Sequence, residues 1–136
     1  MMRSVLLLPL LGALGEAATT RVLFVGNSFT FVNELPQQLA HVAASLGQGV
    51  FVNSSTVGGC TVYAQTADPA LGNDALTAEL LADPLGWDYI VLQTYSSLPL
   101  VKAARERMLA PAVDAFSARA AALRPKPARL VMYLTW

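Results

Sequence analysis

The sequence predicts an α/β domain in which helices cover both faces of a parallel sheet, a three-layer α/β/α arrangement. Short apolar runs with the length of a buried strand recur at residues 21–25, 50–52, 87–93 and 129–135. The stretches between them carry apolar residues at helical spacing or turn-forming residues. Strands that alternate with helices are joined by crossover connections, and crossovers of this kind produce a parallel sheet.

The first half of the chain predicts strand, helix, strand. The run 21–25 ends at Gly26 and Asn27, as a buried strand should. A helix follows and ends near Gly47, and the second strand runs from residue 50 toward Val57-Gly58-Gly59. The apolar residues that recur there at helical spacing are Leu35, Leu39, Val42, Ala43 and Leu46.

The second half predicts two helices around the third strand. Residues 68–73 read as a loop, after which Asp74 or Thr77 caps a short helix that reaches Leu81. Residues 101–123 read as a long helix, and Pro111 predicts a kink or a division into two because proline lacks a backbone donor. The inner stripe expected for this helix is Val101, Ala104, Met108, Ala112, Ala115 and Leu123.

Composition excludes several classes of protein. Of 136 residues, 54% are hydrophobic and 13% charged, which is too apolar for a disordered chain. Nine basic residues balance nine acidic ones, so phosphate neutralisation gives no reason to expect nucleic-acid binding. The single cysteine, Cys60, excludes an intramolecular disulfide and a CxxC motif. The length allows one domain.

The two ends of the chain carry further expectations. Arg3, the apolar run 5–15 and the small residues Ala17 and Ala18 predict a secretory signal peptide at 1–18, followed by a domain at 19–136. An apolar first strand or helix is the alternative. The run is too short to span a bilayer. The last predicted strand is not followed by a covering helix, so a carboxy-terminal portion of the domain is expected to be missing.

Polar residues follow each predicted strand, and in an open parallel sheet the carboxyl ends of the strands form the binding edge. Ser28 follows the first strand, Gly58 and Gly59 the second, and Gln93 ends the third. A hydroxyl nucleophile, backbone amides and a carboxamide are the parts of an acyl-transfer site. On spacing alone, capping of the next helix is the commoner role of Asn27 and Ser28.

Other kinds of site find less support. The run 26–30 has one glycine where a dinucleotide fingerprint needs three, and the chain has no G-K-[ST] sequence. The acidic residues are scattered, so neither a metal site nor a glycosidase pair is predicted, and no cofactor is expected. A phosphate held by residues 27–30 at a helix start remains an alternative.

Four segments in order resemble the SGNH (GDSL-like) hydrolases. The run 22–30, with 33–36 behind it, resembles the first block in the branch that writes GNS for GDS. Residues 57–61 resemble the second block, and 87–93 with Ser96 and Pro99 the third. The strand end at 133–136 is similar to a later part of the same branch. The resemblance implies an esterase with a flavodoxin-like parallel sheet.

The resemblance also implies roles for particular residues. Ser28 would be the nucleophile, and its backbone N–H and that of Gly59 would be oxyanion donors. The family's third donor is an asparagine in a G-x-N-D motif, which is absent here; Gln93 is the carboxamide at that place. A strand-end glutamine bonded to a neighbouring loop is the alternative role for Gln93.

The general base is the main departure from the family. The family's base is the histidine of a D-x-x-H block, which these 136 residues lack. His41 lies 13 residues after Ser28 in the next helix, nearly 20 Å along it at about 1.5 Å per residue, so a partly buried position on that helix is expected instead.

These residues are therefore expected to be inactive or nearly so as an esterase. The expected substrate is a small-molecule or carbohydrate ester. The alternative function is a non-catalytic ligand-binding module or a truncated remnant with the same fold.

Overall fold

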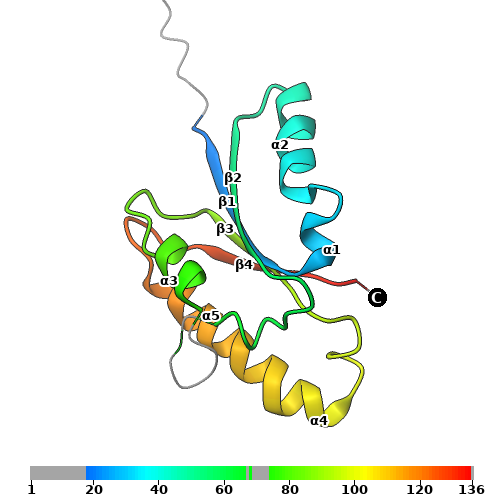
Figure 1. Ribbon diagram of the computed structural model, residues 1–136. Coiled ribbons are helices and arrows are strands. Elements are labelled where there is room, and N and C mark those ends of the chain that lie inside the picture. Colours follow the sequence, from blue (N-terminus) through cyan, green and yellow to red (C-terminus); the bar gives the residue numbers. More distant parts are fainter. Residues whose placement is uncertain (1–17, 67, 69–73, 136) are drawn as a thin grey trace, which may run out of the picture.

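A computed structural model describes residues 18–66, 68 and 74–135, so the predicted signal peptide lies outside the described residues except for Ala18. Four parallel strands form one sheet in the order β2-β1-β3-β4 (Figure 1). They are β1 (Thr20–Gly26), β2 (Val50–Thr56), β3 (Tyr89–Gln93) and β4 (Arg129–Tyr133). The four predicted strands and the parallel sheet are confirmed.

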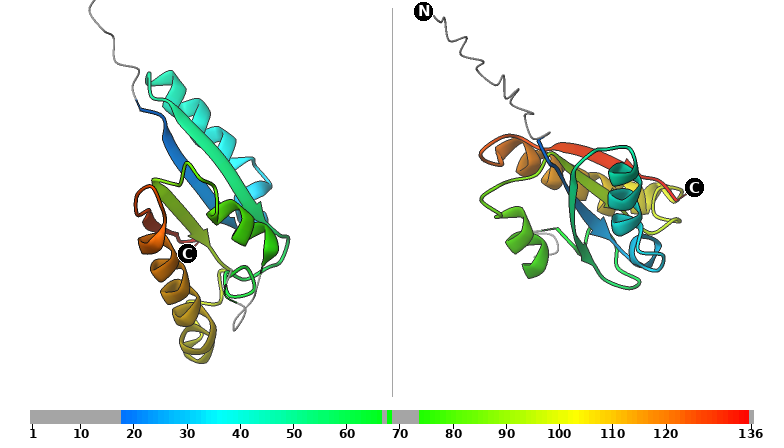
Figure 2. Two further views of the ribbon diagram at one scale, coloured as in Figure 1. Left: turned by 90° about the vertical axis from the view of Figure 1, so that its left-hand side faces the viewer. Right: turned by 90° about the horizontal axis from the view of Figure 1, so that it is seen from above.

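Helices lie on both sides of the sheet, which confirms the three-layer arrangement (Figure 2). The short α1 (Ser28–Phe31) and α2 (Leu35–Ser45) connect β1 to β2. On the other side, α3 (Ala75–Leu81) precedes β3, and its start is capped as expected, because the Asp74 carboxylate accepts the Thr77 backbone N–H at 2.7 Å. The chain from α4 (Lys102–Ala104) through the π-helical η1 (Arg105–Leu109) to α5 (Ala110–Ala122) returns to β4.

The main hydrophobic core fills the space between the sheet and α5. Alternate residues of the two central strands point into it, and α3, α5 and Trp87 complete it. Its fully or nearly fully buried members include Leu23, Val25, Leu81, Trp87, Ile90, Leu92, Ala112, Phe116 and Ala120. Val22 and Phe24 point to the opposite face of β1 and are buried as well.

The helix predicted from the spacing of its apolar residues is present as α2, but most of those residues are not buried. Leu39, Val42 and Leu46 are 39%, 59% and 71% exposed, and Leu35 and Ala43 are half-buried. The residue of α2 that is buried is Pro36. The apolar stripe of α2 therefore does not face the sheet. Periodicity identified the helix but not the direction in which it faces.

The long helix has its irregularity where Pro111 requires one. The π-helical turn η1 ends at Leu109, two residues before Pro111, and such wider turns accommodate a missing backbone donor. The predicted stripe holds at its carboxyl half but not at its start, because Val101 is 54% exposed. Phe116 and Ala120, which the prediction omitted, make the central contact with the sheet.

β4 is an edge strand with two different faces. Leu130 and Met132 are half-buried against the core, whereas Val131 and Tyr133 on the other face are 40% and 36% exposed. Among the described helices, none is long and apolar enough to cross a membrane.

Candidate active site

Ser28 is the first residue of α1 and stands at the carboxyl end of β1, in the segment 26–30 that we call the serine turn. The side chain of Asn27 caps α1 by accepting the Phe29 backbone N–H at 3.1 Å. Ser28 is partly exposed, and its hydroxyl makes no hydrogen bond to the described part of the chain. The two capping candidates thus have different roles, since Asn27 caps the helix and the Ser28 hydroxyl stays available.

A second turn, at residues 57–60 and called the glycine turn here, lies beside the serine turn. The Val57 N–H donates to the Gly26 carbonyl at 3.1 Å, and the Cys60 N–H closes the turn on the Val57 carbonyl at 3.1 Å. The Asn27 carboxamide donates to the Cys60 carbonyl at 2.9 Å. Gly59 is exposed and has φ +70°, a backbone conformation that side chains disfavour. Asn27 therefore holds Ser28 and Gly59 on adjoining turns.

Gln93 ends β3 and is 1% exposed. Its Oε1 accepts the Asn27 backbone N–H at 2.8 Å and the Thr30 hydroxyl at 3.0 Å, and its Nε2 donates to the Thr94 carbonyl at 2.5 Å. These bonds match the alternative considered for Gln93, a strand-end glutamine bonded to a neighbouring loop. Oxyanion donation by Gln93 would need its carboxamide to face a substrate, whereas here it is enclosed.

A second buried glutamine supports the same turns and was missed by the sequence analysis. The Nε2 of Gln65 donates to the carbonyls of Gly26 and Ser55 at 2.9 and 3.1 Å, and the residue has no exposed surface. The Thr94 hydroxyl accepts the Val62 N–H at 3.3 Å. Gln65 carries no signal in the sequence, because it lies in an irregular segment just beyond the motif at 57–61.

His41 lies on α2 and is exposed to solvent. The expectation that it is partly buried is wrong, because α2 directs Pro36 and, in part, its alanines toward the sheet. In Figure 1, α2 leads away from α1, where the serine turn lies. His41 is therefore not placed to accept a proton from Ser28, as the sequence analysis expected.

Cys60 is half-buried beside Gly59 and is the one cysteine of the chain. Burial raises the pKa of the Cys60 thiol above its ordinary value, the Asp74 carboxylate raises it further, and a backbone hydrogen bond at Thr61 opposes these effects. A thiol with a raised pKa stays protonated at neutral pH and is a poor nucleophile. Cys60 accordingly behaves as a small residue that packs in the turn.

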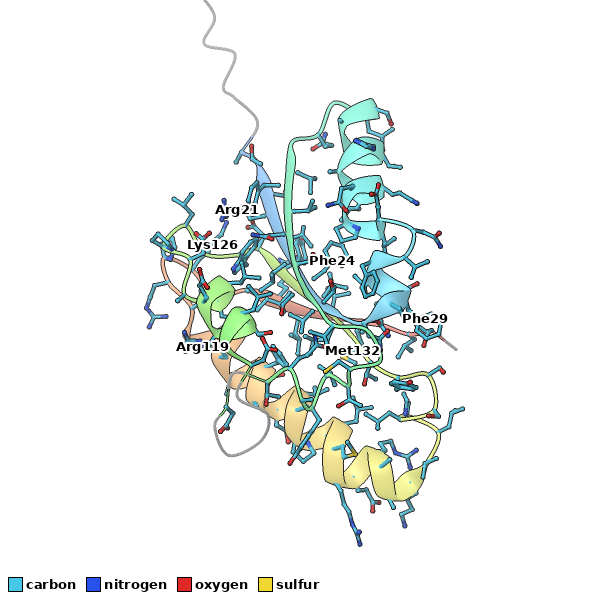
Figure 3. The ribbon with its side chains drawn as sticks, viewed as in Figure 1. Arg21, Phe24, Phe29, Arg119, Lys126 and Met132 are labelled. Atoms are coloured by element: carbon cyan, nitrogen blue, oxygen red, sulfur yellow. The ribbon has the colours of Figure 1, made fainter. Side chains whose placement is uncertain are left out.

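Charged side chains gather at the opposite, amino end of the strands. Figure 3 places Arg21 and Lys126 there, whereas Phe29 of the serine turn lies at the far edge. Arg21 pairs with Asp83 at 2.8 Å and stacks on the rings of Phe51 and Trp87.

Lys126 pairs with Asp88 at the same end of the sheet. Burial alone would raise the pKa of Asp88, but the hydrogen bonds from Lys126 and from the Arg21 backbone outweigh it and lower that pKa. These contacts fix the end of the sheet that is remote from Ser28.

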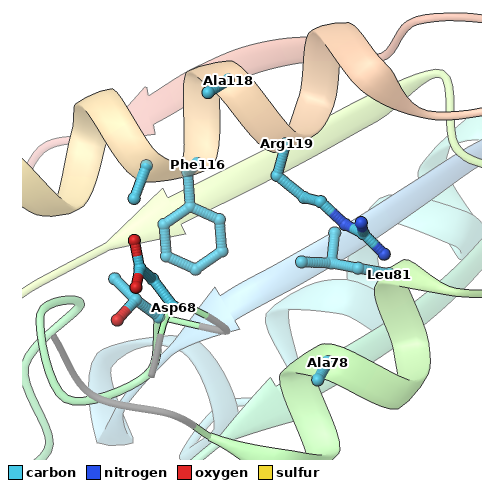
Figure 4. A pocket seen from close by; sticks show the side chains of 8 residues that line it. Asp68, Ala78, Leu81, Phe116, Ala118 and Arg119 are labelled. Carbon is cyan, nitrogen blue, oxygen red and sulfur yellow. The ribbon is translucent and has the colours of Figure 1, made fainter. Parts of the chain in front are cut away.

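Two of the cavities on the described surface have a mainly apolar lining. One of about 220 Å³ lies beyond the ends of β3 and β4 and is lined by Thr94, Tyr95, Pro99, Leu100, Tyr133, Leu134 and Thr135. It is mainly apolar and shares the carboxyl edge of the sheet with Ser28. The other, of about 360 Å³, lies between α3 and α5 (Figure 4). Ser28, Gly59 and Gln93 do not line either of them.

Comparison with known proteins supports the fold. No protein-family model and no curated protein sequence matches the chain. The crystal structure of TesA matches with a TM-score of 0.54 and 19% sequence identity. The match covers 83% of this chain and 59% of the TesA chain, so this chain spans less than two thirds of that protein. This chain therefore shares with TesA an α/β fold with a parallel sheet.

Proposed function

We propose that the protein is a secreted serine ester hydrolase of the GNS-type SGNH branch, with Ser28 as its nucleophile. The observation that carries the proposal is the unbonded hydroxyl of Ser28 at the carboxyl edge, beside a turn whose exposed Gly59 has φ +70°. A partly exposed serine next to backbone amides suits attack on an ester carbonyl. Secretion rests on the signal-peptide pattern at 1–18 alone.

The proposed reaction proceeds in two steps. The Ser28 Oγ attacks the ester carbonyl carbon and loses its proton to a base, and the carbonyl oxygen becomes an oxyanion that the N–H groups of Ser28 and Gly59 stabilise. The alcohol leaves as the acyl-serine forms, and water then releases the acid. The 136 residues offer no histidine beside Ser28, so we propose that they react slowly by themselves at neutral pH.

Substrate choice belongs to the proposal as well. An acetyl ester of a carbohydrate follows from the resemblance. The cavity beyond β3 and β4 is lined mainly by Tyr95, Pro99, Leu100, Tyr133 and Leu134, which favours an apolar group on one side of the ester. Comparing p-nitrophenyl acetate with p-nitrophenyl hexanoate separates the two: faster reaction of the longer ester supports a role for this cavity.

The test of the nucleophile uses Ser28→Ala, with Ser45→Ala as its matched control on α2. Labelling by a fluorophosphonate and release of p-nitrophenol are measured at pH 7 and at pH 10, where hydroxide replaces the missing base. We expect Ser28→Ala to abolish label on the tryptic peptide that contains residue 28 and Ser45→Ala to leave it unchanged. Equal labelling of wild type and Ser28→Ala would remove the proposal.

Two glycines test the oxyanion role of the glycine turn. Gly59 and Gly47 have φ +70° and +72°, and a Cβ at either would meet nothing within 4 Å. Alanine at either site should therefore cost about the same stability, roughly 1–2 kcal/mol for the left-handed backbone. Only Gly59→Ala should slow acylation, because its methyl group would obstruct the approach of the ester. Equal rates in the two variants would assign Gly59 to the turn alone.

The second candidate function is ligand binding without catalysis. The apolar cavity at the ends of β3 and β4 is the observation that favours it. This candidate predicts that the protein binds hexanoate or its p-nitrophenyl ester without hydrolysis at either pH and without labelling of Ser28. Calorimetric titration of the wild type and of Leu134→Asp, which places a charge in the cavity lining, measures that binding.

A further inference from the structure

Three motif residues have no role in the proposed reaction, and the structure brings them into one buried contact. Gly26 and Thr30 belong to the G-N-S-F-T sequence around Ser28, and Gln93 ends a strand more than 60 residues later. Thr30 and Gln93 are each 1% exposed. The Gln93 Oε1 accepts hydrogen bonds from the Thr30 hydroxyl and from the backbone N–H of Asn27, the residue directly before Ser28.

Gly26 is the residue that lets these groups meet. A Cβ at position 26 would lie 2.4 Å from the Thr30 Oγ1 and 2.8 Å from the Gln93 Oε1. Gly26 has no unusual backbone angle, so its lack of a side chain is needed for space rather than for conformation. A glycine, a threonine and a glutamine therefore form one packed unit beneath the serine turn.

The same unit reaches the glycine turn through Asn27. The Asn27 backbone is held by Gln93, and its side chain donates to the Cys60 carbonyl while capping α1. Asn27, the residue directly before Ser28, is thus fixed between β3 on one side and the turn of Gly59 on the other. A buried and fully bonded network of this kind holds one geometry.

We infer that Gln93 is a positioning residue, which through Thr30 and Asn27 sets the place of Ser28 relative to Gly59. The inference rests on the proposed function. Gln93 acts from beneath the turn and does not touch the substrate. An oxyanion site works only when its donors are held where the charge develops, and a displacement of about 1 Å can cost about a hundredfold in rate.

The test compares two buried threonines that each donate one side-chain hydrogen bond. Thr30→Val deletes the bond to Gln93, and Thr77→Val deletes a bond of 2.9 Å to the Ser55 hydroxyl near α3. Both residues are 0–1% exposed, so the two variants should lose similar stability. Thr30→Ser keeps the hydroxyl and serves as the rescue variant.

Two readouts are taken on each variant: hydrogen exchange of the Asn27 and Phe29 amides by NMR, and the rate of Ser28 labelling by a fluorophosphonate at pH 10. We expect Thr30→Val to accelerate exchange at both amides and to slow labelling about tenfold or more. Thr77→Val and Thr30→Ser should stay within about threefold of wild type. Gln93→Leu should slow labelling further; if it does not fold, the Thr30 variants still decide the matter.

The outcomes separate this inference from the proposed function. Equal labelling of Thr30→Val and Thr77→Val overturns the positioning role, even if both variants are less stable. If wild-type Ser28 does not react, the proposed function fails, and unchanged exchange at Asn27 in Thr30→Val would overturn the inference as well. If the Asn27 amide exchanges faster in Thr30→Val and at the wild-type rate in Thr30→Ser, the result supports the positioning of the serine turn, whether or not Ser28 reacts.

Discussion

Replacing Gly26 by alanine is expected to destabilise the domain by about 2–4 kcal/mol. The new methyl group would lie 2.4 Å from the Thr30 Oγ1 and 2.8 Å from the Gln93 Oε1, far inside ordinary contact. Relief requires the Thr30 hydroxyl or the Gln93 carboxamide to move, and either movement breaks buried hydrogen bonds worth about 1 kcal/mol each and leaves polar groups unpaired. Alanine regains only about 0.5–1 kcal/mol from the stiffer unfolded chain.

Urea unfolding measures this loss, with the fluorescence of the fully buried Trp87 as a probe. Gly47→Ala is the control, because a Cβ there meets nothing within 4 Å and costs only the φ of +72°. Adding Thr30→Ala to Gly26→Ala should restore part of the loss, because it removes the closer of the two clashes. A Gly26→Ala protein within 1 kcal/mol of wild type, or strict additivity with Thr30→Ala, would refute the reasoning.

Three further predictions concern the core, the amino end of the sheet and the thiol. Phe116→Ala should cost about 3–5 kcal/mol in urea unfolding, and Val42→Ala less than about 0.5 kcal/mol, because the first is 2% and the second 59% exposed; equal losses would contradict the observed orientation of α2. Asp88→Asn should cost about 1 kcal/mol at pH 7, discounted for partial exposure. The pKa of Asp88 is lower in the folded chain, so the stability that its carboxylate adds is fully present above the unfolded pKa near 4 and is lost as the pH falls through the folded pKa. If the free energies of unfolding of wild type and Asp88→Asn differ by the same amount at pH 7 and pH 2, this prediction is wrong. Because the pKa of Cys60 is raised, iodoacetamide at pH 8 should modify this thiol more slowly in the native protein than in urea. The Cys60→Ala variant should react with a fluorophosphonate at Ser28 as wild type does. Loss of that label would give the thiol a role in the reaction.

The sequence predicts the strands better than the faces of the helices. A buried parallel strand is apolar on both sides, so a continuous run such as 21–25 marks it without any knowledge of its neighbours. The periodicity of apolar residues predicts a helix, but the direction in which its apolar side faces depends on what the helix packs against. This is why the spacing predicts a helix at residues 35–45 but does not predict that Leu39, Val42 and Leu46 are exposed.

The candidate site divides in the same way. Ser28, Gly59 and Gln93 could be nominated because parallel strands bring their carboxyl ends to one edge. The separate roles of Asn27 and Ser28 could not be assigned, because both residue types cap helices equally well. Gln65 could not be found at all, since only its buried contact with Gly26 and Ser55 gives it a function.

The sequence by itself therefore determined the α/β class, the four strands and the edge at which the chemistry should lie, because these depend on local hydrophobicity and on the direction of parallel strands. Only the tertiary structure decided which polar groups are enclosed and which remain available. Gln93 and Ser28 are both polar residues at strand ends, yet one accepts two buried hydrogen bonds and the other presents an unbonded hydroxyl. That difference depends on neighbours more than 60 residues apart, since a hydrogen bond is made by atoms in space and not by positions along the chain.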